Sequence, residues 1–389
     1  FYKKNLDANF KIQKEPNGTG DALKTGIEKN NEDSILLVLY ADVPLIREKT
    51  IKKLINIGKE NICLLTTHIN NPLGYGRVVK EEELAVNIVE EKEATLEEKK
   101  IKEIFTGVLC GPKKDIIKGL EQIKNNNSTG EFYLTDIVSI INSDGGKIQT
   151  LSTSYQEVMG ANDKSDLEEL ERAYRKMKTE ELLEMGIALA DKTRVDIRGS
   201  IKAGKDCFID VNVVLEGDII LGDNVVIKPN TLVKDSSIGS NTIIESFSHI
   251  CNAKVGSSCQ IGPYARLREG SEISNEAKVG NFVETKKTKL GKKSKANHFS
   301  YLGDANIGEE TNIGAGTITC NYDGKQKNKT KIGNKSFIGT NSSLVAPVTI
   351  GSGSYVAAGS VITKDVPDGK MGISRSKQET KRTPFNKDN

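Results

Sequence analysis

The residue best suited to acid–base chemistry is His298, one of three histidines in the chain. A neutral imidazole can accept a proton from an attacking amine, so His298 is a candidate general base. Arg268, Lys286, Lys287 and Lys295 lie one or two repeat units away in the sequence, and together they can form a pocket for a phosphate. The alternative is a solvated turn histidine among surface lysines, an interpretation that fits Lys287 and Lys295 best.

A second candidate site lies in the first half of the chain. Asp42 directly follows an apolar run, at the end of a strand where open α/β sheets bind ligands. A carboxylate at that point can hold Mg²⁺ against phosphate oxygens. Residues 16–22 (PNGTGDA) form a glycine-containing loop whose backbone N–H groups can face an anion. Taken alone, Asp42 could equally be a turn or helix-capping residue, and a single Gly-Thr-Gly is a weak signal.

The second half repeats an aliphatic residue followed by glycine, with spacings that all fall within one residue of a multiple of six. The pairs begin at Leu221, Ile238, Val255, Ile261, Val279, Leu290, Leu302, Ile307, Ile313, Ile332, Ile338 and Ile350. Such a hexapeptide forms one short strand and one turn of a parallel β-helix, with the aliphatic side chain stacked inside. The glycine then lies where φ is positive or where the backbone is crowded.

One interval that breaks the exact phase, the 19 residues after Ile313, contains a polar segment at residues 322–329. We expect this segment to leave the coil as a loop, the kind of place where functional residues collect.

The first half has an α/β pattern. Residues 34–40 form a continuous apolar run that predicts a buried strand of a parallel sheet, and residues 62–67 predict a second strand. Helices are predicted at residues 48–57, 113–124, 135–141 and 163–185. We therefore expect an α/β domain at 1–164, a helical linker at 165–185 and the repeat domain at 186–389.

The composition narrows the class of protein. The 389 residues are 36% hydrophobic and 28% charged, with a net charge of +3 that gives no reason to expect nucleic acid as a partner. No apolar run approaches the roughly 20 residues of a membrane span, and the start of the chain has no signal-peptide pattern. The six cysteines include no CxxC pair, which favours a reducing cytoplasm over a zinc site or a disulfide framework.

Three stretches carry a resemblance that covers nearly the whole chain: residues 280–287 (GNFVETKK), 295–304 (KANHFSYLGD) and 312–324 (NIGAGTITCNYDG). They resemble the bacterial bifunctional N-acetylglucosamine-1-phosphate uridylyltransferase/glucosamine-1-phosphate acetyltransferase family. The resemblance implies an incomplete, Rossmann-like nucleotidyltransferase domain followed by a left-handed parallel β-helix. It further implies a homotrimer acting on small molecules, with acetyl-CoA and UTP as co-substrates and Mg²⁺ at the uridylyltransferase site.

For the acetyltransferase site, the resemblance implies His298 as general base. We expect Glu284 to orient its imidazole. Contacts to the sugar phosphate are implied for Arg268, Lys286, Tyr301 and Asn312. Contacts to acetyl-CoA are implied for Ala315, Asn321, Tyr322, Thr340, Ala358 and Arg375, with Thr340 keeping the hydroxyl of the usual Ser.

For the uridylyltransferase site, the resemblance implies contacts to the nucleotide sugar at Gln13, Gly18, Thr19, Tyr40, Ala41, Asp42, Gly76, Glu90 and Asn162, with Asp42 and Asn162 as Mg²⁺ ligands. The family's glycine-rich nucleotide loop would precede Phe1, so we expect a truncated N-terminus. Phe105 replaces a sugar-binding Asn, and Pro16, Asn17 and Asp21 also depart from the pattern. Phe105 either weakens sugar binding or stacks on the sugar ring.

The sequence thus predicts an enzyme that acetylates glucosamine-1-phosphate and, where its first site is complete, transfers a uridylyl group to the product. Two alternatives remain: an acetyltransferase for another amino sugar, and a non-catalytic structural solenoid. The second would show a flat, Thr-rich face and no need for a histidine among basic residues.

Overall fold

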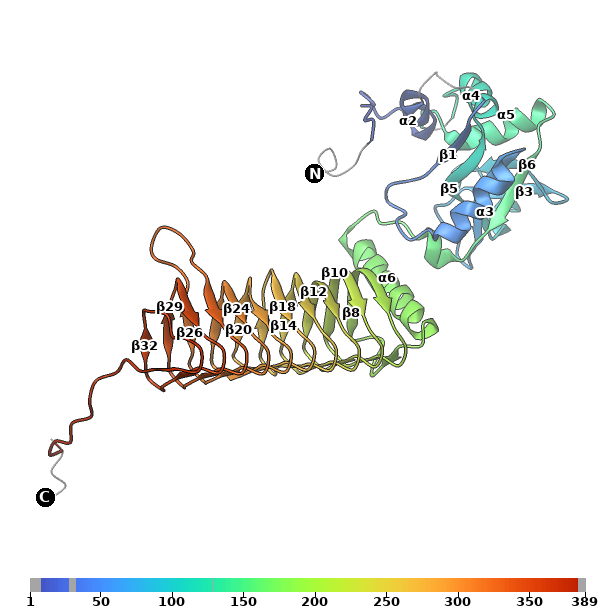
Figure 1. Ribbon diagram of the computed structural model, residues 1–389. Helices are drawn as coiled ribbons and strands as arrows, with labels where there is room; N and C mark the ends of the chain where they lie inside the picture. Colours follow the sequence, from blue (N-terminus) through green and yellow to red (C-terminus); the bar gives the residue numbers. More distant parts are fainter. Residues whose placement is uncertain (1–7, 28–32, 128, 384–389) are drawn as a thin grey trace, which may run out of the picture. The chain divides into compact units, whose positions relative to one another are not determined.

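The computed structural model describes residues 8–27, 33–127 and 129–383, and it divides the chain into two compact units, 1–174 and 175–389. The division falls inside α6 (Lys164–Glu184). Figure 1 shows an α/β unit and a long coil of short strands. No helix among the described residues is long and apolar enough to cross a membrane.

The first unit is built on a mixed sheet in the order β4-β3-β5-β2-β6, with β1 paired to β5. The long β5 lies between β2 on one edge and β3 and β1 on the other. The strands are β1 (Ile35–Val38), β2 (Ile62–His68), β3 (Arg77–Glu81), β4 (Leu84–Val89), β5 (Glu103–Pro112) and β6 (Ile148–Ser152). The helices are α2 (Thr19–Gly26), α3 (Glu48–Gly58), α4 (Lys113–Gln122) and α5 (Ile137–Ser143), with short 3₁₀ turns η1 (Glu98–Lys100), η2 (Leu134–Asp136) and η3 (Tyr155–Val158).

The prediction for residues 34–40 was wrong in two respects. β1 pairs antiparallel with β5, and only its last residue, Val38, is buried. In this sheet only β2 and β6 pair in parallel. An apolar run fits an edge strand covered on one face as well as a central one, so hydropathy alone could not separate the two. The predicted strand at 62–67 and helix at 48–57 are confirmed by β2 and α3.

The second unit is a parallel β-helix with three faces. Face one carries β7 (Ala188–Leu189), β9 (Phe208–Ile209), β11 (Val226–Ile227), β13 (Ile243–Ile244), β16 (Gln260–Ile261), β19 (Lys278–Asn281), β22 (Lys295–His298), β25 (Asn312–Ile313), β28 (Phe337–Ile338), β31 (Tyr355–Val356) and β33 (Met371–Gly372). Face two carries β14 (His249–Cys251), β17 (Arg266–Leu267), β20 (Glu284–Lys286), β23 (Tyr301–Gly303), β26 (Ile318–Cys320), β29 (Ser343–Val345) and β32 (Val361–Ile362).

Face three carries β15 (Ala253–Val255), β18 (Ser271–Ile273), β21 (Lys289–Leu290), β24 (Ala305–Ile307), β27 (Thr330–Ile332) and β30 (Val348–Ile350). At the start of the coil, β8 (Val195–Ala203), β10 (Val213–Leu221) and β12 (Leu232–Ile238) run over faces two and three together.

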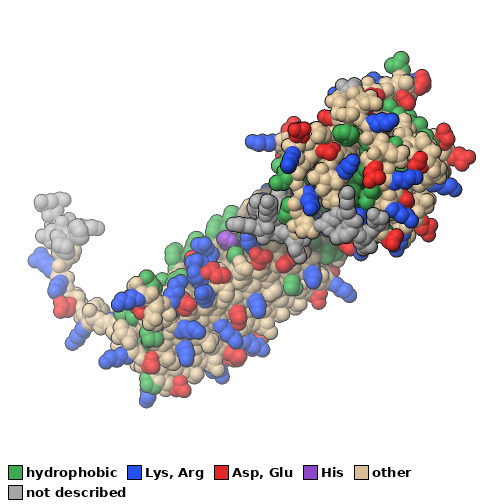
Figure 2. Space-filling view, turned by 90° about the horizontal axis from the view of Figure 1, so that it is seen from above, with side chains coloured by type: hydrophobic (Ala, Val, Ile, Leu, Met, Phe, Trp, Pro, Cys, Tyr) green, Lys and Arg blue, Asp and Glu red, His purple; other side chains and the backbone are tan. Residues whose placement is uncertain are grey.

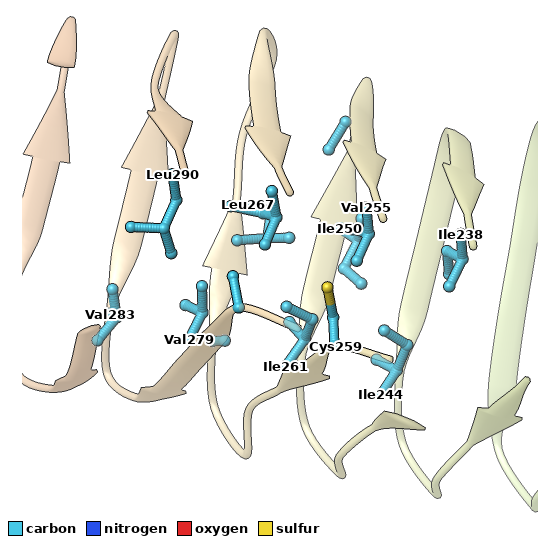
Figure 3. Close-up of a cluster of buried hydrophobic side chains, with 14 of the residues drawn as sticks. Ile238, Ile244, Ile250, Val255, Cys259, Ile261, Leu267, Val279, Val283 and Leu290 are labelled. Carbon is cyan, nitrogen blue, oxygen red and sulfur yellow. The ribbon is translucent and has the colours of Figure 1, made fainter. Parts of the chain in front are cut away.

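The core of the β-helix is a continuous stack of aliphatic side chains. Figure 3 shows Ile244, Ile261 and Val279 repeating from coil to coil inside the structure, with Ile250 and Leu267 stacked on another face. All five are fully buried, with exposed fractions of 0%. Leu182 of α6 joins the same cluster, so the last turns of that helix cover the first coil. The predicted inward stacking of the aliphatic residues is confirmed.

Most of the repeat glycines are required by crowding rather than by φ; Gly262, with φ 96°, is an exception. A Cβ on Gly239 would lie 2.6 Å from the backbone carbon of Gly256 in the next coil. Positive φ instead occurs at corner residues such as Asn241, with φ 59°. The predicted loop leaves the coil between β26 and β27, and Figure 1 shows it rising above the β-helix.

Candidate active sites

Face two carries a ladder of charged side chains, because alternate residues of its short strands point outward. Register pairs Arg266 with Glu284, and Glu284 with Tyr301, so these three side chains stack on successive coils. A second column lies two residues further on, where Lys286 pairs with Gly303 and Arg268 follows β17. The repeat therefore brings Arg268, Lys286 and Tyr301 together on adjacent coils.

Two carboxylates neutralise much of this positive charge. Glu284 Oε1 accepts a hydrogen bond from Arg268 Nη1 at 2.8 Å, and its Oε2 lies 3.7 Å from Arg266 Nη1. Among the described residues, Glu284 thus forms its ion pairs with arginines of face two and not with the imidazole of His298. Glu269 Oε1 lies 3.0 Å from Lys286 Nζ. The hydrogen bond that Arg268 donates to Glu284 raises the pKa of Arg268, and the hydrogen bond that Lys286 donates to Glu269 lowers the pKa of Glu269.

Tyr301 lies over the small surface left by Gly303. A Cβ on Gly303 would be 2.5 Å from Tyr301 Oη and 2.8 Å from Asn321 Nδ2. Asn321 Nδ2 in turn donates to Asp304 Oδ2 at 2.6 Å. The buried Asn321 therefore lies beside the Tyr301 phenol, joining a residue implied for acetyl-CoA to one implied for the sugar phosphate.

His298 ends β22 on face one, opposite Asn281 of β19, and its side chain is exposed. Phe299 follows with φ 46° and turns the chain onto face two, where β23 begins at Tyr301. Only this corner separates His298 from Tyr301 along the chain. Asn312 lies on face one in register with Lys295.

Three residues implied for acetyl-CoA lie on later coils at the same corner as Phe299, between faces one and two, where Gly316 N donates to Phe299 O at 2.9 Å. Asn341 N donates to Ala315 O at 2.7 Å and Gly359 N donates to Thr340 O at 2.8 Å, so Ala315, Thr340 and Ala358 stack along the coil. Arg375 Nη1 donates to Ala358 O at 2.9 Å. Tyr322 lies in the loop, with 61% of its surface exposed.

The first unit contains a cavity of about 750 Å³. Of the nine residues implied for the nucleotide sugar, Ala41 is not part of the cavity wall. The other eight line it: Gln13, Gly18, Thr19, Tyr40, Asp42, Gly76, Glu90 and Asn162. Glycine-loop residues, strand ends and the segment before α6 therefore meet around one space.

A bulge in β5 shapes the wall of this cavity. The register with β2 shifts between Leu64 and Thr66, and Gly107 in the bulge has φ 82°. A Cβ on Gly107 would lie 2.4 Å from Cε2 of Tyr40, so the ring of Tyr40 packs directly on this glycine. Burial raises the pKa of Tyr40, with the nearby Glu90 and Asp42 acting in the same direction and the Thr19 hydrogen bond opposing.

Asp42 and Asn162 form a small set of oxygen donors. Ala161 N donates to Asp42 O at 3.2 Å, which fixes the segment of Asn162 beside Asp42. The amide of Asn162 donates to Asp166 Oδ2 at 3.4 Å, leaving its carbonyl oxygen for a cation. The described residues contain no cluster of three or more His, Cys, Asp or Glu side chains that would hold a metal alone. This pair fits Mg²⁺, which commonly takes one or two protein oxygens plus substrate phosphates.

Comparison with known proteins agrees with both halves of this description. The family model for the bacterial transferase hexapeptide (six repeats) matches residues 204–235 and 329–364. The chain is 48% identical over 371 residues to the bifunctional protein GlmU of Acinetobacter baumannii strain ACICU, covering 95% of this chain and 82% of that protein. It is 47% identical to GlmU of Idiomarina loihiensis, covering 96% and 82%, and 44% identical to GlmU of Acinetobacter baylyi, covering 94% and 81%.

The chain belongs to the GlmU family. Two of the departures that the resemblance indicated, Phe105 and Asp21, lie in the first unit. Phe105 lines the cavity yet is only 8% exposed, because its ring joins the core cluster that contains Val78 and Ile88. Asp21 accepts a hydrogen bond from Gln13 Nε2 at 2.7 Å, so this substitution touches a residue implied for nucleotide binding.

The structure adds residues that sequence analysis missed. Thr135 lines the cavity and donates to Glu90 Oε1 at 2.9 Å. Glu269 and Asp304 bind side chains of the face-two site. Thr135 carried no signal in the sequence, whereas Glu269 directly follows Arg268 and its charge could have been considered with that cluster.

Proposed function

We propose that the site on faces one and two of this GlmU family enzyme is its acetyltransferase centre and that His298 is the general base. The enzyme acetylates glucosamine-1-phosphate with acetyl-CoA. It also transfers a uridylyl group from UTP to N-acetylglucosamine-1-phosphate, giving UDP-N-acetylglucosamine and pyrophosphate. The observation that carries the assignment of the centre is the placement of His298 one corner away from Tyr301, on whose face Arg268 and Lys286 also lie.

The chemistry at this centre follows from the side chains. The sugar amine attacks the thioester carbon of acetyl-CoA, and His298 takes the proton that the amine loses. CoA leaves as the thiolate when the C–S bond breaks. Arg268 and Lys286 supply charge-assisted hydrogen bonds to the sugar phosphate, and Tyr301 and Asn312 orient the sugar. The stacked carbonyls and amides at Ala315, Thr340 and Ala358 support an extended coenzyme along the coil.

We propose that three copies of the chain assemble through an aromatic ridge at the corner beside His298. Phe247, Tyr264, Phe282 and Phe299 stack along four coils with ring centroids 4.9, 5.3 and 5.1 Å apart. Each ring leaves about half or more of its surface exposed. A contiguous exposed apolar ridge of this kind usually marks a protein contact. Assembly there would bring neighbouring chains next to His298, which fits a site shared between subunits.

In the first unit, we propose that the cavity binds the nucleotide sugar and that Asp42 and Asn162 hold Mg²⁺. The cation would neutralise phosphate charge during uridylyl transfer. Tyr40 and Glu90 form part of the wall, while Thr19 and Gly18 present the start of α2 to the substrate. All six cysteines are free, which supports a cytoplasmic location for an enzyme that uses acetyl-CoA and UTP.

A structural solenoid is not favoured. The outward side chains of β17, β20 and β23 on face two are Arg, Glu, Lys and Tyr rather than rows of Thr. Figure 2 shows basic and acidic side chains interspersed over the visible surface of the β-helix.

Replacement of His298 tests the proposal. His298→Ala should lower turnover by about 10²- to 10⁴-fold, because general base catalysis typically contributes that much. Folding should change little, since the side chain is exposed. Release of CoA in the presence of glucosamine-1-phosphate is followed with a thiol reagent, and His249→Ala, another exposed histidine on the coil, is the control. Near-normal turnover of a folded His298→Ala would reject the assignment.

A further inference from the structure

Glu269 has no role in the chemistry described above, yet its carboxylate lies among the cations of the face-two site. Its Oε1 is 3.0 Å from Lys286 Nζ and its Oε2 is 3.8 Å from Arg268 Nε. No other salt bridge to Lys286 occurs in the described part of the chain. In the free chain, therefore, Glu269 forms an ion pair with the Lys286 ammonium group, which we propose binds the sugar phosphate.

Lys286 and Glu269 differ in how far their side chains are exposed to solvent and therefore in how freely they can move. The Lys286 side chain is only 16% exposed, whereas that of Glu269 is 48% exposed at a corner of the coil. The backbone of Glu269 is fixed, because its carbonyl accepts a hydrogen bond from Lys287 N at 3.0 Å. The carboxylate can thus rotate into solvent without disturbing the coil, while the ammonium stays in place.

The second carboxylate of the site has a different position. Glu284 is 30% exposed and contacts both Arg266 and Arg268, so it is held between two guanidinium groups. Within residues 8–27, 33–127 and 129–383, Lys286 pairs with no second carboxylate. A phosphate that approaches Lys286 must therefore displace Glu269, but it need not displace Glu284.

We infer that Glu269 is a built-in competitor of the phosphate group, which sets the affinity of the acetyltransferase site for its phosphorylated sugar. This inference rests on the proposed function of Arg268 and Lys286. When phosphate binds, Glu269 swings out, and its ion pair with Lys286 is exchanged for a pair with an anion of higher charge. When product leaves, Glu269 returns and again pairs with the partly buried Lys286 ammonium group.

Removal of the carboxylate charge tests the inference. In Glu269→Gln, the KM for glucosamine-1-phosphate should fall about two- to fivefold, the amount expected for one partly exposed ion pair. The kcat and the KM for acetyl-CoA should stay unchanged. The difference from the parent enzyme should shrink at high salt, because exposed charges are screened. Glu272→Gln is the matched control. It removes an exposed carboxylate from β18, the next strand along the chain, which lies on face three, and it should change none of these values.

Titration calorimetry with inorganic phosphate measures the same competition without turnover, and phosphate should bind Glu269→Gln more tightly than the parent. An unchanged or increased phosphate Kd and sugar KM in Glu269→Gln would overturn the inference and make Glu269 a structural partner of Lys286. Absence of glucosamine-1-phosphate-dependent CoA release in the parent enzyme would instead reject the proposed function, while the calorimetry would still decide the role of Glu269.

Discussion

The hydroxyl of Tyr301 lies directly above the Cα of Gly303, two residues along the same strand, where a Cβ would come within 2.5 Å of it. The obstacle to a larger residue is thus the far end of a side chain, which can move. Gly303→Ala should therefore fold normally but displace Tyr301 and the adjacent Asn321. We expect the KM for glucosamine-1-phosphate to rise about tenfold, as for the loss of one hydrogen bond to the substrate.

Gly239→Ala provides the contrasting control. There the added Cβ would meet the backbone of Gly256 and Ser257 at 2.6 Å, and the backbone of a stacked coil has no room to shift. This variant should lose about 1–3 kcal/mol of unfolding free energy while keeping its KM. Chemical denaturation and steady-state kinetics on both variants check the pair. If Gly303→Ala proved the less stable of the two and kept its KM, the relationship between Tyr301 and Gly303 would be packing alone.

The spacing of aliphatic–glycine pairs was sufficient to predict the β-helix, because each coil repeats one local interaction. Inward stacking of Ile261 and Val279 is confirmed for that reason. The sheet of the first unit was harder to predict, since the partner of β1 is chosen by contacts distant in sequence, and β1 proved antiparallel to β5. The same limit applies to the sites: Arg268 and Lys286 were recognisable from the repeat phase, but the carboxylate of Glu269 between them depends on a side-chain direction that spacing does not give.

The aromatic ridge should hold the assembled enzyme together. Phe282 stacks between Tyr264 and Phe299 and is 52% exposed, so Phe282→Ser removes the middle of the proposed contact without opening the core. We expect the Phe282→Ser assembly to dissociate at a higher protein concentration than the parent assembly, and acetyl transfer to be lost in parallel. Light scattering combined with activity at a series of protein concentrations measures both.

A matched control lies on face one, where Phe337 stacks on Tyr355 at 5.0 Å and is 42% exposed. Phe337→Ser makes the same chemical change outside the ridge and should leave the assembly intact. A Phe282→Ser monomer with full activity would show that the site is complete within one chain.

Asp136 should give the first unit an unusual pH dependence. Burial, with repulsion from Glu93 and Glu90, raises the pKa of Asp136 to about 6. The folded state therefore binds a proton more tightly than the unfolded state, and this stabilising contribution is lost as pH rises from about 4 through about 6. Asp136→Asn should be more stable than the parent at neutral pH by about 1 kcal/mol, a value reduced for the partial exposure of the group, and the difference should vanish toward acid.

Asp144 supplies a control of opposite sign in the same unit. Its hydrogen bond with Lys118 lowers the pKa of Asp144, so its stabilising contribution is present at neutral pH and lost as pH falls. Asp144→Asn should thus be less stable than the parent at neutral pH. Urea denaturation of both variants across this range separates the two signs. If the stability difference between Asp136→Asn and the parent did not change with pH, burial and the neighbouring carboxylates would not raise the pKa of Asp136.

We expect Phe105 to form a functional part of the cavity wall rather than to impair binding of the nucleotide sugar. Its ring is 92% buried in the cluster with Val78 and Ile88, and its backbone N donates to Gly76 O at 3.1 Å, beside a residue implied for nucleotide-sugar binding. In Phe105→Asn, a polar amide replaces an aromatic ring in that cluster, which should lower the free energy of unfolding by about 3–5 kcal/mol. Phe105→Leu keeps an apolar group there and should lose less than half as much.

Because the ring shapes the wall, the affinity for UDP-N-acetylglucosamine should fall in Phe105→Asn and change little in Phe105→Leu, as measured by calorimetry at a temperature where all three proteins are folded. Tighter binding by Phe105→Asn would show instead that the cavity retains its place for an amide and that Phe105 impairs the site.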